Sequence, residues 1–233
     1  RSFVESGWSL KELHRLILRS STYQMSIHNE ATETASIVDP ENRLLSRFHP
    51  QRMTAEQIRD SILSVCGQLD LRLNGKSVPL RNRQFVFDHT SIDNTRYDSL
   101  RRAAFLPVIR NNVYTLFEQF DFPDPTMPTG SRNTTTVAPQ ALLLMNSELV
   151  INASKRLASQ VCSSVSSPSE RIDLLYREVH GRRVSPHERE RALAFVASGS
   201  SSGESLNEEG AVQENWFLLS QSLLLSNEFI FIK

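Results

Sequence analysis

Several features are scarce in this sequence of 233 residues, and each scarcity excludes a class of protein. Only two cysteines are present, Cys66 and Cys162, and no Cys-x-x-Cys-His motif occurs, which excludes covalent attachment of c-type haem within these residues. No run approaches the roughly 18 consecutive apolar residues of a membrane-spanning helix. Basic and acidic side chains number 26 each, whereas a dedicated nucleic-acid binder carries a basic surplus. We therefore expect no membrane span in this segment and no nucleic-acid partner.

Short catalytic and metal-binding motifs are missing as well. The sequence has no nucleophile elbow, phosphate-binding loop or dinucleotide-binding glycine motif. The six histidines are scattered, and no two of them have the His-x-x-x-His spacing that favours zinc. Both cysteines lie among apolar helical neighbours, so we expect two buried thiols rather than a disulfide. We assign no catalytic residue, metal ligand or cofactor to this segment, and the pattern favours a protein that is not an enzyme.

Helical periodicity is what the sequence does contain, and three helices are predicted near the N-terminus. The first covers residues 8–17, where Ser9 begins a capping box ahead of apolar residues at helical spacing. The second is expected to start at Asp39, because an N-capping acid followed by proline is typical of a helix N-terminus. The third starts at Thr54, which begins another capping box, and ends near Gly67.

The periodicity fails in the middle of the chain, between residues 71 and 107. Asn74 and Gly75 together predict a turn. Two segments, 84–87 and 103–109, have the composition of short strands. We therefore expect an irregular region here rather than regular helices.

Helices return in the second half of the sequence. The expected segments are a short helix at 112–120, helices after Pro139 and from Ser147 to about Cys162, and helices at 170–179, from Ser185 and at 212–228. Prolines end the first of these, a serine-rich break covers 163–169, and Gly181 ends the helix at 170–179. The Ser/Gly/Glu-rich stretch at 199–210 is of low complexity and is expected to be disordered.

These patterns predict a mainly α fold, an irregular multi-helix domain with a loop-rich middle that holds one or two short strands. We expect a single domain over residues 1–233, and the alternative is a separate C-terminal helical subdomain at 168–233. The sequence opens at Arg1 without an initiator methionine or a leader. We therefore expect a fragment of a longer multidomain chain.

The most unusual stretch is the proline-rich loop that follows residue 120. Asp121 and Asp124 lie three residues apart in it, and Arg132 follows closely. Two carboxylates suit an acid–base pair or calcium ligation, although two acids do not complete a calcium shell. The structural alternative is that an acid pairs with Arg132, or caps a helix, and holds the loop against the core. The candidate binding residues in and around this loop are Arg110, Asn111, Asp121, Asp124, Arg132, Thr135 and Gln140.

A basic segment is the second candidate for binding. Between Arg43 and Arg110 there are 12 lysines and arginines against 6 acids. A positive surface of this kind steers an anionic partner, such as a sulfated glycan, an acidic protein patch or a haem propionate. Solvated arginines and internal ion pairs explain the same composition equally well.

Several segments taken together resemble a known family. They are Trp8–Ile17, Ser21–Tyr23, Asp39–Leu45, Glu56–Ile62, Phe120–Pro125, Thr135–Leu142, Met145–Ser147 and Leu224–Phe229. In combination they resemble the planctomycete-specific C-terminal domain of unknown function, of the PSD-one type, over nearly the whole chain. Each segment alone is weakly specific.

This resemblance implies a bacterial, extracytoplasmic protein in which the domain follows a cytochrome-like domain. Haem c would belong to that upstream domain and not to this segment. The family has no established activity, so it supplies no catalytic residues. We expect a non-catalytic interaction module that docks against the upstream cytochrome-like domain. The alternative is a polysaccharide-directed domain that binds or hydrolyses a glycan through Asp121, Asp124 and Arg132.

Overall fold

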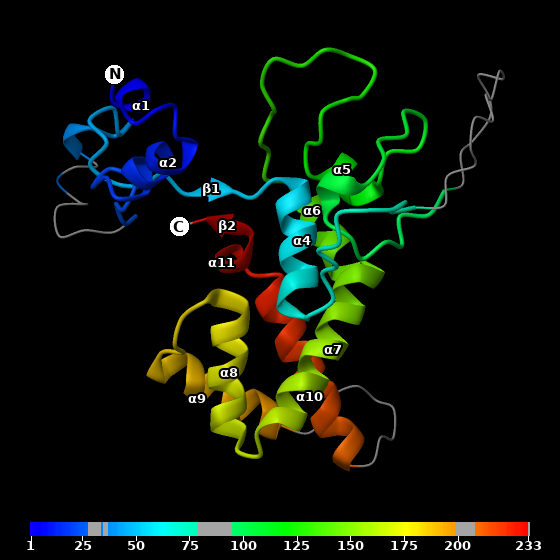
Figure 1. Cartoon of the computed structure of the whole chain (residues 1–233). Helices are drawn as coiled ribbons and strands as arrows, with labels where there is room; N and C mark the ends of the chain where they lie inside the picture. The colour runs from blue at the N-terminus through cyan, green and yellow to red at the C-terminus, as the bar shows by residue number, and fades with distance from the viewer. Residues whose placement is uncertain (28–33, 35–36, 79–94, 199–207, 233) are drawn as a thin grey trace. The chain divides into compact units, whose positions relative to one another are not determined.

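The computed structural model describes residues 1–27, 34, 37–78, 95–198 and 208–232, and in this part the chain is mainly α-helical (Figure 1). The helices are α1 (Ser2–Glu5), α2 (Leu10–Leu18), α4 (Ala55–Val65), α5 (Thr115–Gln119), α6 (Ala138–Asn146), α7 (Glu148–Ser164), α8 (Pro168–His180), α9 (Pro186–Ala197), α10 (Glu208–Leu224) and α11 (Asn227–Ile230), with a 3-10 turn η1 (Ala103–Phe105). Strands β1 (Gln51–Arg52) and β2 (Phe231–Ile232) pair antiparallel, with Gln51 opposite Ile232. The predicted fold class is confirmed. The predicted strand at 84–87 and most of the low-complexity stretch at 199–210 lie outside the described residues.

The chain divides into two compact units. Unit 1 contains residues 1–52 and 231–233, and unit 2 contains residues 53–230. The single domain over 1–233 and the subdomain at 168–233 both stay predictions, because packing alone does not show which parts unfold together.

In unit 1, α1 and α2 form from local signals. Ser9 caps α2 by accepting a hydrogen bond from the backbone N–H of Glu12, so the predicted start of this helix is confirmed. The carboxylate of Glu12 pairs with Arg15 one turn further along. Only the serine half of the predicted capping box is therefore observed.

The helix predicted to start at Asp39 is wrong. The Asp39 carboxylate accepts hydrogen bonds from the amides of Arg43 and Leu44, at 2.9 and 2.8 Å, which are one to two residues beyond the amides that a helix cap binds. Asn42 has a φ of +52°, which takes the backbone out of the right-handed helix. Its buried side chain then closes a turn onto Arg47. The capping residue therefore organises a turn instead of a helix.

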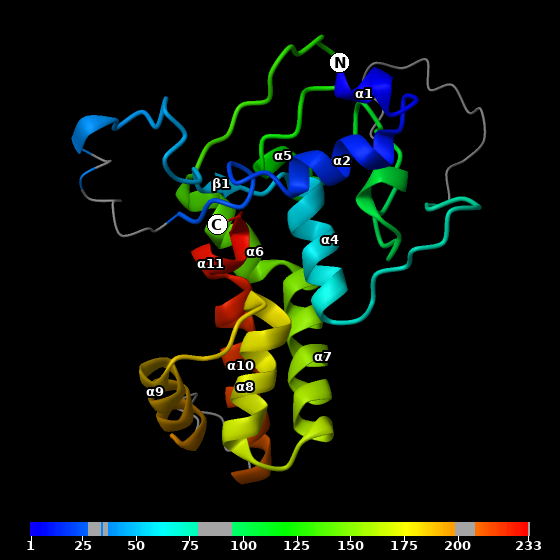
Figure 2. The same ribbon diagram turned by 60° about the vertical axis from the view of Figure 1, so that its left-hand side comes forward.

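The core of unit 2 is built from α7, α8 and α10, which lie side by side (Figure 2), with α4 packed against α7. Its largest fully buried apolar side chains are Trp216, Ile58, Ile62, Leu63, Leu144, Leu157, Ile172, Leu175 and Leu224. Apolar residues three and four apart face this core along each helix. Burying them supplies most of the stability of the unit.

Most helix boundaries in unit 2 are confirmed. Thr54 begins α4 with both hydrogen bonds of a capping box, and Ser185 begins α9 in the same way. Gly181 ends α8 in the left-handed conformation, with φ at +67°. Each boundary has a short-range chemical signal, so the sequence alone was enough to find it.

The loop-rich middle is held by two buried arginines. Arg59 on α4 donates to the backbone carbonyls of Ser99 and Arg101, and Arg101 itself donates to the carbonyls of Arg72 and Asn74. The strand predicted at 103–109 is wrong, because residues 103–105 form η1 and the amide of Ala103 donates to the carboxylate of Asp60 at 2.8 Å. Side-chain bonds to the backbone replace a sheet in this region.

Both cysteines are free thiols, as predicted. Cys66 is buried, and this burial raises the pKa of its thiol. Cys162 is only half-buried, so the prediction of burial is right for the first thiol and too strong for the second.

Candidate functional site

The structure brings three of the candidate binding residues together. Asp121, with φ at +59°, accepts hydrogen bonds from the amide and the hydroxyl of Thr135, both at 2.9 Å. Gln140 is buried on α6 and donates to the Thr135 hydroxyl at 3.2 Å and to the carbonyl of Gln119 at 2.9 Å. This chain of contacts fastens the end of α5 to the start of α6.

The other two members of the proline-rich loop have contacts elsewhere. Asp124 accepts bonds from the amide and the hydroxyl of Thr126, which lowers the pKa of its exposed carboxyl group. Arg132 forms its ion pair with Glu56 on α4, at 2.9 Å, and its guanidinium lies over the ring of Phe122. These contacts hold the loop to its own unit.

Arg110 and Asn111 lie on an exposed turn ahead of α5. Several cations of the basic segment are used within the protein, since Arg59 and Arg101 are buried, and Arg72 pairs with Asp70. A binding role for the seven candidate residues stays a prediction. We call the proline-rich loop that follows residue 120 the Asp121 loop. Its observed contacts are structural.

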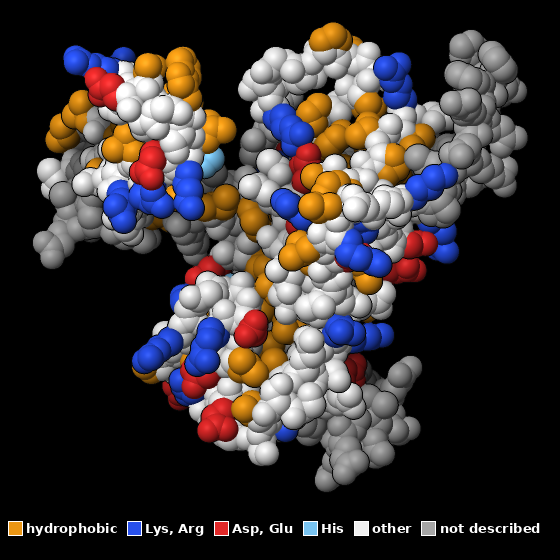
Figure 3. Space-filling model, in the orientation of Figure 1, with side chains coloured by type: hydrophobic (Ala, Val, Ile, Leu, Met, Phe, Trp, Pro, Cys, Tyr) orange, Lys and Arg blue, Asp and Glu red, His pale blue; other side chains and the backbone are white. Residues whose placement is uncertain are grey.

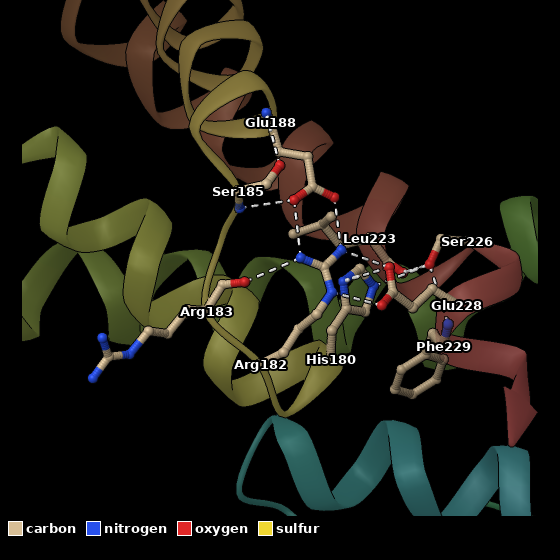
Figure 4. A network of polar contacts seen from close by, with 9 residues as sticks. All are labelled: His180, Arg182, Arg183, Ser185, Glu188, Leu223, Ser226, Glu228 and Phe229. Atoms are coloured by element: carbon tan, nitrogen blue, oxygen red, sulfur yellow. Dashed lines mark hydrogen bonds and ion pairs between the residues drawn. The ribbon is translucent and has the colours of Figure 1, made fainter. Parts of the chain in front are cut away.

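A second polar cluster, which the sequence did not predict, is centred on Arg182 (Figure 4). The guanidinium binds two carboxylates at once: Glu188 on α9 at 2.6 and 2.9 Å, and Glu228 on α11 at 2.6 and 2.7 Å. These bonds lower the pKa of Glu188 to about 2 and raise the pKa of Arg182. We call Arg182, Glu188 and Glu228 the arginine clamp. It joins the loop after α8 to α9 and α11.

His180 and Ser226 lie beside the arginine clamp, and together with Glu228 they resemble a Ser-His-acid catalytic triad. The Nε2 atom of His180 is 3.1 Å from the Ser226 hydroxyl, and its Nδ1 atom is 3.6 Å from the Glu228 carboxylate. The Ser226 hydroxyl, however, donates to the carbonyl of Leu223 at 2.7 Å and accepts from the amide of Phe229 at 3.2 Å. Its oxygen therefore caps the turn between α10 and α11, which is a structural role and not that of an activated nucleophile.

The sequence predicts two local elements next to this cluster but not the contact that joins them to Glu228. The helix that starts at Ser185 is predicted by the sequence, and so is the helix stop at Gly181. Glu228 comes from the far end of the chain, 46 positions after Arg182. Local spacing carries no signal for a contact of that separation.

Unit 1 contains a third candidate, an apolar surface on α1, α2 and the segments that follow them. Its exposed large hydrophobic side chains are Val4, Trp8, Leu10, Leu16, Ile17, Leu18, Tyr23, Ile37, Val38, Leu44 and Leu45. Some of the hydrophobic side chains on the surface of unit 1 are visible in Figure 3. In the described part of this unit the only buried residue is Asn42, which is polar. We call the exposed side chains of Trp8 and of α2 the α2 face.

A pocket of about 320 Å³ opens between α1 and α2. Phe3, Leu13 and Leu16 give it an apolar wall, while Arg15 and Arg19 lie at its border. The α2 face thus combines exposed apolar side chains with the charged side chains of Glu12, Arg15 and Arg19 beside them.

The comparison with family models decides what the chain is related to. Residues 1–196 match the PSD1 model, described as a protein of unknown function (DUF1553). The chain belongs to the PSD1 family. The PSD-one family assignment made from the sequence is thereby confirmed, whereas planctomycete specificity and the position after a cytochrome-like domain stay predictions. No curated protein and no solved structure matches the chain.

The described part of this PSD1 chain contains neither a metal-binding cluster nor a membrane-spanning helix. No three His, Cys, Asp or Glu side chains there are grouped so that they hold a metal ion. None of the described helices is both long and apolar enough to cross a bilayer. The Asp121 loop, the arginine clamp and the α2 face are thus the features to which a function can be attached.

Proposed function

We propose that this PSD1 chain is a non-catalytic interaction module and that the α2 face is its docking surface. The observation that carries the proposal is the imbalance in unit 1, whose described residues expose twelve large hydrophobic side chains, Ile232 included, and bury no apolar one. A nine-residue helix is marginal in water on its own and needs packing for its stability. A partner that covers the α2 face supplies that packing.

The partner that we propose is a cytochrome-like domain upstream in the same protein, because the family resemblance implies a planctomycete chain with such a domain. The setting we propose is extracytoplasmic, with haem c on the upstream domain. Lys11, Arg15 and Arg19 border the apolar side of α2, and Glu12 already pairs with Arg15. The α2 face therefore suits an apolar partner surface with an acidic rim.

The test is calorimetric titration of this chain with the upstream segment of its native protein, with haem absorbance recorded alongside. We expect micromolar or tighter binding, which corresponds to at least about 8 kcal/mol. Replacing Leu10 and Ile17 together by serine is expected to weaken the binding at least about tenfold. The control is Leu142→Ser on α6, because Leu142 is 57% exposed and Leu10 is 63% exposed.

Two results would contradict the docking function. One is the absence of heat and of any spectral change with the wild-type chain. The other is an equal loss of affinity in the Leu142→Ser control, which would show that any exposed leucine matters and that the α2 face is not specific.

The alternative partner is a polysaccharide bound at the Asp121 loop, and two variants in that loop test it. Asp121→Asn and Asp124→Asn are screened against a glycan array together with the wild type. Loss of glycan binding at an unchanged melting temperature would favour the alternative. A lower melting temperature without any glycan binding would leave the loop with its structural role.

A further inference from the structure

The arginine clamp fastens α11, the last helix of unit 2. Glu228 is the second residue of this helix, and Arg182 binds both of its carboxylate oxygens. Strand β2 begins at Phe231, directly after α11 ends at Ile230. Loss of the Glu228 contacts would free α11 from the loop that follows α8.

His180 lies behind the clamp with its side chain 3% exposed (Figure 4). Its Nε2 atom contacts the Ser226 hydroxyl, and its ring lies edge-on to Tyr176, with the centroids 5.4 Å apart. Its Nδ1 atom is buried and lacks a hydrogen-bond partner among the described residues, with a carboxylate oxygen of Glu228 at 3.6 Å. The imidazole thus lies between its own helix, α8, and the turn and first residues of α11.

Titratable and charged groups face His180 from the surrounding elements. Tyr176 lies on its own helix, Arg182 on the following loop, Glu188 on α9 and Glu228 on α11, while α10 presents the Leu223 carbonyl. The two carboxylates favour a charged imidazolium and Arg182 opposes it, but Arg182 already binds both carboxylates. Burial is the largest effect and lowers the pKa of His180 below its usual 6.5.

We propose that His180 is a proton-sensitive latch, which holds α11 in place while its ring is neutral and releases it in mild acid. Protonation places a positive charge on a ring that is 3% exposed and lies beside the cation of Arg182, so the closed form is the poorer environment for it. In the open form the ring is in water and takes up the proton more readily, so acid favours that form. This inference concerns unit 2 and is independent of the docking function proposed for unit 1.

The pH window follows from the direction of the pKa shift. Because the folded pKa lies below the unfolded value, the contribution of His180 is complete above about pH 6.5 and is lost as the pH falls below it. At one pH unit below that value, the open form gains at most about a tenfold advantage. The whole chain is therefore compared at about pH 7.5 and about pH 5.5 by hydrogen exchange, corrected for intrinsic rates.

We expect the opening of the amides of residues 226–230 to rise several-fold, up to about tenfold, in the wild type at the lower pH. His180→Gln is expected to remove this rise, because glutamine does not titrate. His187 is the matched control: it is an exposed histidine on α9, and His187→Gln is expected to keep the wild-type response. An equal response in His180→Gln and the wild type would overturn the latch.

Greater protection of α11 in acid would also overturn it, because it would mean that Glu228 outweighs burial and closes the latch on protonation. If His180→Gln does not fold, the wild type still decides the matter through an NMR titration of the His180 ring. A shared midpoint for the ring and the α11 amides supports the latch. Separate midpoints refute it.

Discussion

Unit 1 and unit 2 use the same helix signals with different results. Ser9 caps α2 and Thr54 caps α4, so each helix begins with its own local hydrogen bond. The apolar face of α4 is then buried, with Ile58, Ile62 and Leu63 at 0% exposure, whereas Leu10 on α2 is 63% exposed. A local cap sets where a helix begins, but tertiary packing supplies most of the stability of the helix. The two units therefore differ in where their stability originates.

The largest effect is expected for Trp216→Ala, which tests the packing of the core of unit 2. Trp216 is 1% exposed, and its ring lies under the guanidinium of Arg171. Truncation leaves a cavity among packed helices and is expected to lower the free energy of unfolding by about 3–5 kcal/mol. Urea denaturation followed by far-UV circular dichroism measures the change. A loss below about 1 kcal/mol would show that α10 is not central to the core.

The second test asks whether the irregular middle is held as firmly as the helices. Arg59→Met keeps the length of the side chain but leaves the carbonyls of Ser99 and Arg101 without their donors, and we expect a loss of about 3 kcal/mol. Arg102→Met is the control because Arg102 is half-exposed, and its loss is expected to stay within about 0.5 kcal/mol. Equal losses in the two variants would contradict a special role for Arg59.

The third test uses pH to measure the arginine clamp. Arg182 lowers the pKa of Glu188 from the usual 4.5 to about 2, so the stabilisation is present above about pH 4.5 and is lost as the pH falls towards 2. Asp70 and Asp173 also have lowered pKa values and titrate in this window, so we expect Glu188→Gln to lose roughly 1–2 kcal/mol less than the wild type. Thermal unfolding at stepped pH measures both. Glu190→Gln, an exposed position on the same helix, is expected to behave as the wild type.

The smallest expected effect compares the two caps directly. Thr54→Ala removes a complete capping box and is expected to lower the unfolding free energy of unit 2 by about 1 kcal/mol. Ser9→Ala is expected to change the main unfolding transition by less than about 0.3 kcal/mol, because α2 contributes little to a buried core. Chemical denaturation of the two variants side by side is the measurement. A loss of unfolding free energy for Ser9→Ala as large as that for Thr54→Ala would contradict this difference between the units.

The sequence allowed most helices to be predicted, and the successes share one cause. Thr54, Gly181 and Ser185 act on atoms within a few residues, so their effect is visible in a short window. The helix at Asp39 was predicted wrongly because the left-handed conformation of Asn42 decides the outcome, and a capping residue does not reveal it. Propensity was overridden by a side-chain turn.

The candidate sites were harder to predict, because their contacts join distant parts of the chain. Asp121 and Thr135 are 14 positions apart, and Arg132 pairs with Glu56 76 positions away. Composition indicated that the Asp121 loop is unusual but did not indicate which partner each side chain takes. The partner of His180 is Ser226, and no periodicity in the sequence connects the two residues.

The pairing of β1 with β2 has a consequence for synthesis on the ribosome. Gln51 and Ile232, which face each other in the sheet, leave the exit tunnel roughly 180 residues apart. At about 5–20 residues per second, the first strand waits about ten to forty seconds for the second. During that interval the nascent α2 face is exposed and β1 has no partner strand from its own chain.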